Sequence, residues 1–469
     1  MKILLIEPPF ARFMGFYRFF FPFALSSLSA YLQRQGHEVL IYDAEHKEGH
    51  PVDMNSTDLL DVFPRYLDGI QDAEHPIWLE AEGVMREFAP DLIGITYLST
   101  KKGAVEFLAR MAKRLFPDVP LVLGGSHASF LPESSLEQTG ADFVVMGEGE
   151  ETFLELLHFL AKEDERFSEI RGLAFRDPSG RFVTTPARPL IAHLDSLPFP
   201  DRESLHRVDS YRPDDMSMIM TSRGCPFDCT FCSSLWERRA RFRSIDNILA
   251  EIVYLKERFG IENIYFKDDT FTVNRKWLLA FCEALKQKDL GVKWECLTRI
   301  ELVDEELILR MREAGMFNLK IGIETGSERL LKATHKNISL AQIREGAAVL
   351  KRMGQKWSAF FMLGYPDETE EEMRMSRELI EEIRPTYVSM SVLVPYPGCA
   401  TYTELERDGI LTADADWNLY DPFSLQANAS RIFPFAEFQK KVRETMAFVD
   451  HYNLHSEALS SKISATKQA

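Results

Sequence analysis

The sequence predicts an α/β protein built from two successive series of parallel strands, followed by a small, mostly helical C-terminal region. Residues 1 to 160 alternate short apolar runs with segments of helical periodicity, which is typical of an open parallel sheet. After a Pro-rich connection near residue 200, six further strand and helix alternations predict a partial (β/α)6 barrel. We expect domains at residues 1–165, 206–400 and 401–469, with a hairpin and linker at residues 166–205.

The first series is expected to form a sheet with one polar edge. Strands are predicted at 2–9, 37–45, 91–100 and 120–127, helices at 23–36 and 104–116, and a fifth strand running directly into a helix over 141–160. Parallel sheets bind ligands outside the carboxyl ends of their strands. The segments at that edge are Glu7–Pro9, Asp43–His46, Thr96–Thr100, Gly124–His127 and Gly147–Glu150.

A hairpin and a linker separate the two series. Alternating patterns flank residues 177–180, Asp-Pro-Ser-Gly, which is a hairpin turn signal. The strands of the second series are expected at 217–223, 263–270, 292–299, 317–325, 358–366 and 387–397, and its helices at 246–260, 275–288, 303–315, 340–354 and 370–383. Because active sites of such barrels lie at the carboxyl ends of the strands, functional residues are expected there.

Composition and charge narrow the functional class. The chain is 45% hydrophobic and 27% charged, which is ordinary for a globular protein, and its net charge of -17 repels phosphate backbones. A small-molecule substrate is therefore expected, and nucleic acid is not. The start of the chain lacks the features of a signal peptide, and its most apolar stretch, 13–32, is interrupted by Arg18 and Pro22. We expect no transmembrane helix.

Three of the six cysteines form a metal-binding pattern, "TSRGCPFDCTFCSS", in which Cys225, Cys229 and Cys232 are spaced C-x3-C-x2-C. This clustering is no disulfide framework, and it favours a reducing cytoplasm. A structural zinc ion takes four ligands and a catalytic one usually includes histidine, whereas three thiolates on a cubane cluster leave one of four irons open. A zinc site completed by His206 or Cys282 stays as the alternative, without regular ligand spacing.

This motif, with Phe231 before the third cysteine and after the first strand of a βα barrel, resembles the radical S-adenosylmethionine (SAM) superfamily. The resemblance implies a 4Fe-4S cluster on Cys225, Cys229 and Cys232 whose open iron chelates SAM. It also implies reductive cleavage of SAM to a 5'-deoxyadenosyl radical that abstracts hydrogen from the substrate.

The ends of the later barrel strands carry residues that would line the SAM cavity in that family. The resemblance implies SAM contacts for the following residues: Phe231, Asp268, Asp269, Arg299, Glu324, Thr325 and Gly364. For any one polar residue among them, helix N-capping is the alternative, because Asp and Thr at βα junctions commonly cap helices. Cys282 and Cys296 are expected in the core. Cys399 stands where relatives tend to have Thr, either as a catalytic hydrogen donor or as a neutral substitution.

The first domain resembles the cobalamin-binding, Rossmann-like domain that precedes some radical SAM barrels. Residues 96–98, Thr-Tyr-Leu, match its Ser-x-Leu position, and Gly124-Gly125 match its paired glycines. The residues implied to bind cobalamin are Pro9, Thr96, Tyr97, Leu98, Ser99, Gly124, Gly125, Ser126, His127, Gly147, Glu148 and Gly149. The alternative for Ser126 and His127 is structural, with Ser126 as the N-cap of a helix and His127 in its first turn. His46 and Gly49 keep the His-x-x-Gly pattern, but His46 is one residue too far from Asp43. Two interpretations of His46 therefore stay open, a cobalt ligand and a histidine in an exposed loop.

The aromatic run at residues 10–21 is expected to pack in the interior, to line a pocket or to touch a membrane surface, and packing or a pocket is favoured.

Taken together, the resemblance covers residues 1 to about 400 and implies a cobalamin-dependent radical SAM enzyme. It includes class B methyltransferases, which act on unactivated carbon or phosphorus, and the anaerobic magnesium-protoporphyrin IX monomethyl ester cyclase. Methyl transfer is the first expectation. A cyclase or oxidase reaction without net methylation, with or without cobalamin, and a non-catalytic iron–sulfur protein are the alternatives. The expected partners are a small-molecule substrate and an electron donor such as flavodoxin or ferredoxin.

Overall fold

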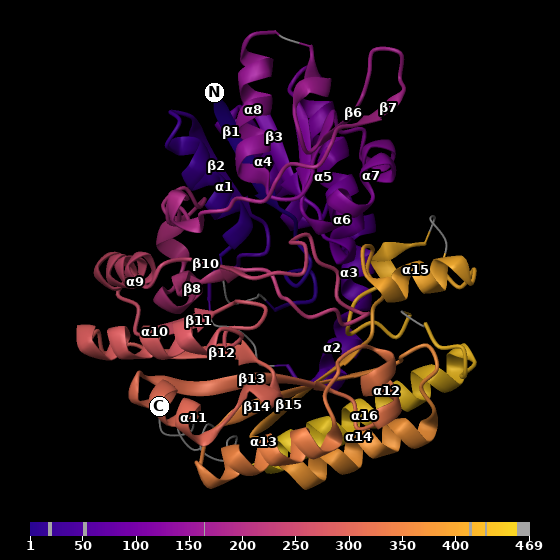
Figure 1. The fold of residues 1–469 in the computed structure, drawn as a ribbon. Coiled ribbons are helices and arrows are strands. Elements are labelled where there is room, and N and C mark those ends of the chain that lie inside the picture. The colour runs from indigo at the N-terminus through magenta and orange to yellow at the C-terminus, as the bar shows by residue number, and fades with distance from the viewer. Residues whose placement is uncertain (17–20, 50–53, 164, 412–414, 427–428, 457–469) are drawn as a thin grey trace. The chain divides into compact units, whose positions relative to one another are not determined.

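The computed structural model describes residues 1–16, 21–49, 54–163, 165–411, 415–426 and 429–456 (Figure 1). The chain divides into two compact units. Unit 1 comprises Met1–Val52, Val62–Met216 and Asp416–Asn418, and unit 2 comprises Asp53–Asp61, Ser217–Ala415 and Leu419–Ala469. Each unit therefore includes a short segment from the stretch of sequence that mainly builds the other.

Unit 1 contains a seven-stranded sheet in the order β2-β1-β3-β4-β5-β6-β7. Five strands are parallel: β1 (Lys2–Glu7), β2 (Glu38–Asp43), β3 (Leu92–Thr96), β4 (Leu121–Gly124) and β5 (Phe143–Val145). The predicted hairpin, β6 (Leu173–Arg176) and β7 (Phe182–Thr184), pairs antiparallel with β5 and extends this sheet. The predicted open parallel sheet is confirmed.

Helices of unit 1 pack in two groups against the sheet. In the first, α1 (Phe23–Gln33) contacts α8 (Gly149–Ala161). In the second, α5 (Lys102–Leu115) contacts α3 (Pro64–Gln71), α4 (Pro76–Phe88) and α7 (Pro132–Thr139), while the short α6 (Ser126–Phe130) follows β4. The helices α3 and α4, which occupy the long connection from β2 to β3, were not predicted.

Described residues of the aromatic run pack in the core of unit 1. Phe10 lies 4.5 Å from Tyr66 between ring centroids, and Phe13 lies 5.2 Å from Trp78. Phe21 is 1% exposed and lies beneath the Arg202 guanidinium, 4.4 Å from its ring centroid. Interior packing is thus confirmed for these three rings. Tyr17, Phe19 and Phe20 lie outside the described residues.

Unit 2 contains the predicted partial barrel. Its six strands are all parallel and lie in the order β15-β14-β13-β12-β11-β8. Their bounds are β8 (Met218–Ile219), β11 (Asn263–Phe266), β12 (Lys293–Thr298), β13 (Met316–Glu324), β14 (Trp357–Leu363) and β15 (Tyr387–Val392). A separate antiparallel pair, β9 (Ser222–Arg223) and β10 (Arg241–Phe242), stands at the start of the cysteine loop.

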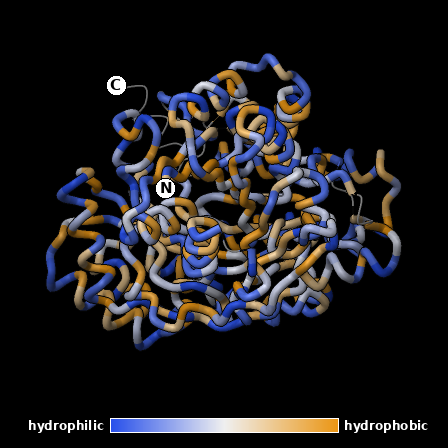
Figure 2. Tube along the Cα trace, turned by 90° about the horizontal axis from the view of Figure 1, so that it is seen from above, coloured by the Kyte–Doolittle hydropathy of each residue, from blue (hydrophilic) through white to orange (hydrophobic). Residues whose placement is uncertain are grey.

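The helices of unit 2 are α9 (Ile245–Phe259), α10 (Arg275–Lys288), α11 (Glu305–Glu313), α12 (Glu328–Ala333), α13 (Leu340–Arg352), α14 (Glu370–Ile383), α15 (Ala400–Arg407) and α16 (Phe435–His455). Outer helices alternate hydrophilic and hydrophobic residues along their length, as amphipathic helices do (Figure 2). Ser339 and Thr369 form capping boxes with Gln342 and Glu372 at the starts of α13 and α14. Polar residues at these βα junctions therefore do cap helices.

The C-terminal helix is fixed to the barrel by polar contacts. Asn453 of α16 accepts a hydrogen bond from the backbone N–H of Val388 (2.9 Å) and donates one to its carbonyl (2.8 Å). Asp450 accepts from the backbone N–H groups of Ser56 and Thr57, at the start of α2 (Ser56–Val62). No described helix is both long and apolar enough to cross a membrane.

Candidate functional site

The three cysteines of the predicted cluster motif lie in one loop after β9. Gly224 begins the loop with a φ of +96°, and a Cβ there would lie 2.2 Å from the carbonyl oxygen of Arg239, so only glycine fits. Arg238 donates hydrogen bonds to the carbonyls of Phe227 and Cys232, both at 2.9 Å. The loop is therefore closed on itself without a disulfide, and all three thiols are free.

The Cys232 thiol is coupled electrostatically to the other two thiols. Although Cys232 is exposed at the surface, desolvation of its sulfur within the loop raises its pKa to about 12, and Cys229, Glu324 and Cys225 contribute to that shift. Burial also raises the pKa of Cys229, while Lys336 and Arg299 oppose this effect. In the absence of a metal, Cys229 and Cys232 therefore favour the thiol over the thiolate.

Asp268 supports the start of the cysteine loop. It is fully buried at the end of β11, and its carboxylate accepts hydrogen bonds from the Thr221 N–H (3.1 Å), the Thr221 hydroxyl (2.7 Å) and the Ser222 hydroxyl (2.5 Å). These protein contacts engage the carboxylate that the resemblance assigned to SAM. The neighbouring Asp269 side chain is exposed, and the Thr270 hydroxyl lies 3.5 Å from the Cys225 sulfur.

The end of β13 combines a strained backbone with a buried ion pair. Glu324 has a φ of +73°, a left-handed conformation that a non-glycine residue adopts rarely. Its carboxylate accepts a hydrogen bond from Lys336 Nζ at 2.7 Å, and both side chains are about nine-tenths buried. The next residue, Thr325, is fully buried, and its hydroxyl oxygen accepts from the Ser327 N–H at 3.2 Å.

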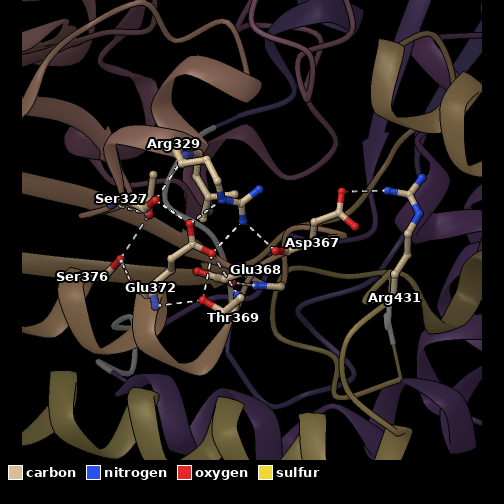
Figure 3. Close-up of polar contacts among 11 residues, drawn as sticks. Ser327, Arg329, Asp367, Glu368, Thr369, Glu372, Ser376 and Arg431 are labelled. Atoms are coloured by element: carbon tan, nitrogen blue, oxygen red, sulfur yellow. Dashed lines mark hydrogen bonds and ion pairs between the residues drawn. The ribbon is translucent and has the colours of Figure 1, made fainter.

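A polar network holds the turn after β14 (Figure 3). Glu372 accepts hydrogen bonds from Arg329 Nε (2.9 Å) and the Ser327 hydroxyl (2.6 Å). Although burial opposes ionisation, these bonds lower the pKa of Glu372 to about 2. Glu368 accepts from the backbone N–H of Gly364 at 2.5 Å, and its own N–H donates to the carbonyl of Tyr365. The turn from Gly364 to Glu368 is thereby fixed.

This turn directs Tyr365 into the interior. The ring is 1% exposed, it meets the Phe231 ring edge-on at 6.5 Å, and its hydroxyl has no hydrogen-bond partner. Burial raises the pKa of Tyr365, and Glu324, Glu368, Cys229 and Cys232 add to the shift. The unpaired hydroxyl therefore lies in the neighbourhood of the cluster motif.

Cys399 caps a helix. Its sulfur accepts a hydrogen bond from the backbone N–H of Tyr402 at 3.3 Å at the start of α15, and the side chain is 1% exposed. Burial raises the pKa of this thiol. Threonine would fill the same capping role, so the structural surroundings match the neutral substitution, and the role as a hydrogen donor remains a proposal.

In unit 1, the paired glycines lie at the end of β4. Gly125 has a φ of +97°, and a Cβ there would lie 2.9 Å from the carbonyl oxygen of Tyr97. The close approach of β3 therefore requires this glycine. Thr96 and Ser126 flank the same junction, with Thr96 buried at the end of β3 and Ser126 as the first residue of α6. Leu98, by contrast, is 38% exposed.

His127 is buried behind these glycines. Its Nδ1 lies 2.8 Å from the Ser99 hydroxyl, its ring stacks on Tyr97 at 4.3 Å, and Trp417 meets it edge-on at 6.0 Å. Burial lowers the pKa of His127 to about 3, so the ring is neutral at pH 7. The Tyr97 hydroxyl is buried without a hydrogen-bond partner.

The remaining predicted cobalamin residues lie at the same carboxyl edge. Gly147 has a φ of +76° and open space around its Cβ position, and its N–H donates to the Ser129 hydroxyl at 3.1 Å. Glu148 accepts from the Ile191 N–H at 2.7 Å, and Gly149 begins α8. Pro9 is buried just after β1.

A buried charge cluster fixes the ends of β1 and β2. Lys101 Nζ lies 2.5 Å from Glu7 and 2.9 Å from Glu45. Glu45 accepts from the backbone N–H of Phe10 at 2.9 Å. Asp43 accepts from the Glu45 N–H and the Tyr211 hydroxyl, both at 3.0 Å. Burial, followed by Glu7 and Glu45, raises the pKa of Asp43 to about 7.

Replacing Asp43 by Asn should stabilise unit 1 at pH 8 but not at pH 4. The folded pKa of Asp43, about 7, exceeds its unfolded value, so the stability that this carboxyl contributes is complete below about pH 4 and lost as the pH rises to 7. We expect a gain of about 2 to 4 kcal/mol at pH 8. Calorimetric unfolding at both pH values measures it, and an equal effect at each pH contradicts the prediction.

His46 has protein partners. Its ring stacks on Tyr211 at 3.7 Å, and its Nε2 lies 2.8 Å from the Ser210 hydroxyl. Burial lowers the pKa of His46. Asp43 contacts Tyr211 and Glu45 rather than the histidine, so the carboxylate expected to orient His46 is engaged elsewhere.

Comparison with known proteins identifies the family. Residues 219–380 match the radical SAM superfamily, and residues 66–157 match the B12 binding domain. An uncharacterized methyltransferase of Pyrococcus horikoshii is 32% identical over 361 residues, which are 76% of this chain and 77% of that protein. The chain belongs to the radical SAM superfamily and carries a B12 binding domain.

Two further similarities extend over most of this radical SAM enzyme. The cytidylyl-2-hydroxyethylphosphonate methyltransferase of Streptomyces wedmorensis is 28% identical over 466 residues, covering 89% of this chain and 84% of that protein. The structure of TsrM, a radical SAM methyltransferase of Kitasatospora setae, was solved with tryptophan and a SAM analogue bound. It matches 94% of this chain and 82% of its own with a TM-score of 0.68 at 20% identity, which shows a shared fold.

The donor set of this radical SAM enzyme fits a 4Fe-4S cluster. Three free thiols belong to one loop, and burial raises the pKa of Cys229 and of Cys232, an effect that bound iron would offset by stabilising thiolates. The two residues considered for completing a zinc site have other surroundings: Cys282 is buried within α10, and the His206 ring meets Tyr42 edge-on at 5.8 Å. Cys225, Cys229 and Cys232 would hold the cluster.

The surroundings also fit SAM and cobalamin. In unit 2, the buried hydroxyl of Tyr365 lacks a partner near Glu324 and Phe231, and Asp269 is accessible. In unit 1, the Tyr97 hydroxyl lacks a partner, and open space surrounds Gly147. These residues would contact SAM and cobalamin, respectively.

Sequence reasoning missed several residues of the two sites. Tyr365 follows Gly364 in the predicted strand, and its inward direction depends on the Glu368 contact that fixes the turn. Lys336 and Lys101 were not singled out, because a buried lysine cannot be told from a surface lysine without its partners. Trp417 is separated from His127 by almost 300 residues of sequence, and no local signal links them.

Proposed function

We propose that this enzyme transfers a methyl group to an unactivated carbon or phosphorus atom of a small molecule. When bound, the cluster and SAM supply hydrogen-abstracting radical chemistry, and cobalamin supplies a methyl group. The observation that carries the proposal is that one chain combines a three-thiol loop at the strand ends of a barrel with a B12-type sheet edge. Its relatives named as methyltransferases span most of the chain and support the proposal.

The chain's own residues have separate tasks in this proposal. Asp268, through Thr221 and Ser222, fixes the start of the cysteine loop. The Glu324–Lys336 pair and the Tyr365 hydroxyl offer charge and a hydrogen-bond donor near the thiols. In unit 1, neutral His127 is held by Ser99 and Tyr97, so it presents no charge to a bound corrin.

The proposal can be tested before the substrate is known. The protein is purified anaerobically with hydroxocobalamin supplied, analysed for iron, sulfide and cobalt, and incubated with dithionite and SAM bearing a deuterated methyl group. We expect stoichiometric cobalt, transfer of the labelled methyl to it, and formation of both S-adenosylhomocysteine and 5'-deoxyadenosine.

Other outcomes identify the alternatives. 5'-Deoxyadenosine without S-adenosylhomocysteine would indicate a cyclase or oxidase reaction, with or without bound cobalt. Iron without any cleavage of SAM would indicate a non-catalytic iron–sulfur protein. Either result would overturn methyl transfer.

Replacing Tyr365 by Phe should weaken SAM binding about 10-fold without destabilising the cluster-loaded protein. The hydroxyl is buried and unpaired, so removing it relieves a penalty of about 1 to 3 kcal/mol in the absence of SAM. Equilibrium dialysis and thermal unfolding measure the two effects. Tyr452→Phe is the matched control: it loses a hydrogen bond to the Pro385 carbonyl (2.6 Å), so stability should fall while SAM binding is unchanged. Wild-type affinity in Tyr365→Phe would refute this role.

We further propose a cytoplasmic location and an electron donor such as flavodoxin or ferredoxin. Six free cysteines support a reducing compartment. Reduction of the isolated enzyme by either donor, compared with dithionite, tests the second point.

A further inference from the structure

The Arg299 guanidinium contacts the cysteine loop and two neighbouring protein acceptors. It lies just after β12 and is 5% exposed. Its Nη1 points to the sulfur of Cys229 at 3.7 Å, and the guanidinium stacks on the Phe227 ring, 3.9 Å from the centroid. Phe227 and Cys229 both belong to the loop that carries the three cysteines. The guanidinium therefore contacts the cluster loop at two points.

The other guanidinium nitrogens are engaged by protein. Nε donates to the Glu301 carboxylate at 2.5 Å, and Nη2 donates to the carbonyl of Lys336. All three nitrogens thus have protein acceptors, one of which is a cysteine sulfur. This arrangement differs from the contact with SAM that the resemblance implied, because each guanidinium nitrogen already has a protein acceptor and Nη1 is directed at the cysteine loop.

We propose that Arg299 is a positioning residue that makes the 4Fe-4S cluster easier to reduce, through an N–H···S hydrogen bond to Cys229 and its fixed positive charge. The inference rests on the proposed cluster on Cys225, Cys229 and Cys232, but not on methyl transfer.

Two physical effects act in the same direction. A reduced cluster carries one more negative charge than an oxidised one, and a cation at short range in a buried site stabilises that charge. Hydrogen bonds to the sulfurs of iron–sulfur clusters raise their reduction potential, and a charged donor strengthens such a bond. The Glu301 carboxylate offsets part of the positive charge of Arg299 but leaves its hydrogen bond to Cys229 intact. The positive charge of the nearby Lys336 is paired with Glu324.

The test compares reduction potentials in Arg299→Gln and Arg299→Lys. Each variant is reconstituted with iron and sulfide, and the cluster is titrated by electron paramagnetic resonance without SAM or cobalamin. We expect four irons per chain in each variant, as in a cubane cluster. At a fixed donor potential near the wild-type midpoint, Arg299→Gln should show a ratio of reduced to oxidised cluster about 10-fold lower than the wild type, equivalent to a shift of about 59 mV to more negative potential. Arg299→Lys, which keeps the charge, should lie between Gln and the wild type.

Arg275→Gln is the matched control. Arg275 lies on α10 and forms exposed ion pairs with Asp304 and Glu306. The variant removes one positive charge, as Arg299→Gln does, but solvent screens the charge at this exposed position, so the reduction potential of the cluster should not change. A full complement of iron with the wild-type potential in Arg299→Gln would overturn the inference, because a role in packing alone leaves the potential unchanged. Loss of iron from both Arg299 variants would also overturn it. If the wild type holds the cluster but no labelled methyl group reaches cobalt, the proposed methyl transfer is wrong. The comparison of reduction potentials between the wild type and the Arg299 variants still tests the role of Arg299.

Discussion

Replacing Cys229 by Ala should reduce iron from about four atoms per chain to near zero and abolish reductive cleavage of SAM. Cys229 is the buried member of the motif, it lies within reach of Arg299, and its backbone carbonyl accepts from the Cys232 N–H at 3.1 Å. A cubane with only two protein thiolates would expose two irons, and such a cluster is expected to be lost on purification. Iron and sulfide analysis, together with the visible spectrum, measures the effect.

Cys282→Ala separates the cluster from the zinc alternative. Cys282 is 3% exposed in α10 and packs in the barrel core. If it completed a zinc site, its removal would release metal as Cys229→Ala does. We expect Cys282→Ala to keep its iron and to lose only the small packing energy of a buried sulfur. Loss of metal from both variants would contradict the cluster assignment.

The element order could be predicted because it depends on local patterns. Apolar runs, helical periodicity and turn residues predicted both parallel sheets and the hairpin at Asp177–Gly180. The strand β8 is shorter than expected, spanning only Met218–Ile219, because the chain then pairs as β9 with β10 before the cysteine loop. Such a change of partner leaves no mark in hydrophobic periodicity.

The positions of candidate residues were easier to predict than their contacts. Asp268 and Arg299 lie at strand ends as expected, yet the hydrogen bonds of Asp268 go to Thr221 and Ser222, and one N–H of Arg299 points to the Cys229 sulfur in the cysteine loop. Strand order shows which edge a side chain occupies, but its partner depends on loop geometry. Asp450 and the start of α2 illustrate the same limit, since almost 400 residues separate these hydrogen-bonded groups.

Replacing Lys101 by Met should destabilise unit 1 by about 3 to 5 kcal/mol, because removal of one partner from a buried ion cluster leaves uncompensated charge. Lys101 is 3% exposed and contacts Glu7, Glu45 and the carbonyl of Pro8. Burial alone would lower the pKa of Lys101, but Glu45 and Glu7 outweigh burial and raise it. Methionine fills a similar volume without the charge, so the loss reports on electrostatics rather than on a cavity.

The pH dependence and a neighbouring residue test this explanation. Lys101 lowers the pKa of the neighbouring Asp43, so without Lys101 that pKa should rise further and the destabilisation should be larger at pH 8 than at pH 5. Lys102→Met changes the next residue, whose partner Glu106 lies one turn along α5, and should cost only about 0.5 kcal/mol. Adding Glu45→Gln to Lys101→Met should restore part of the stability, because the amide oxygen can still accept from the Phe10 N–H. Equal unfolding temperatures for the two lysine variants would show that the Lys101 cluster does not stabilise this edge of the sheet.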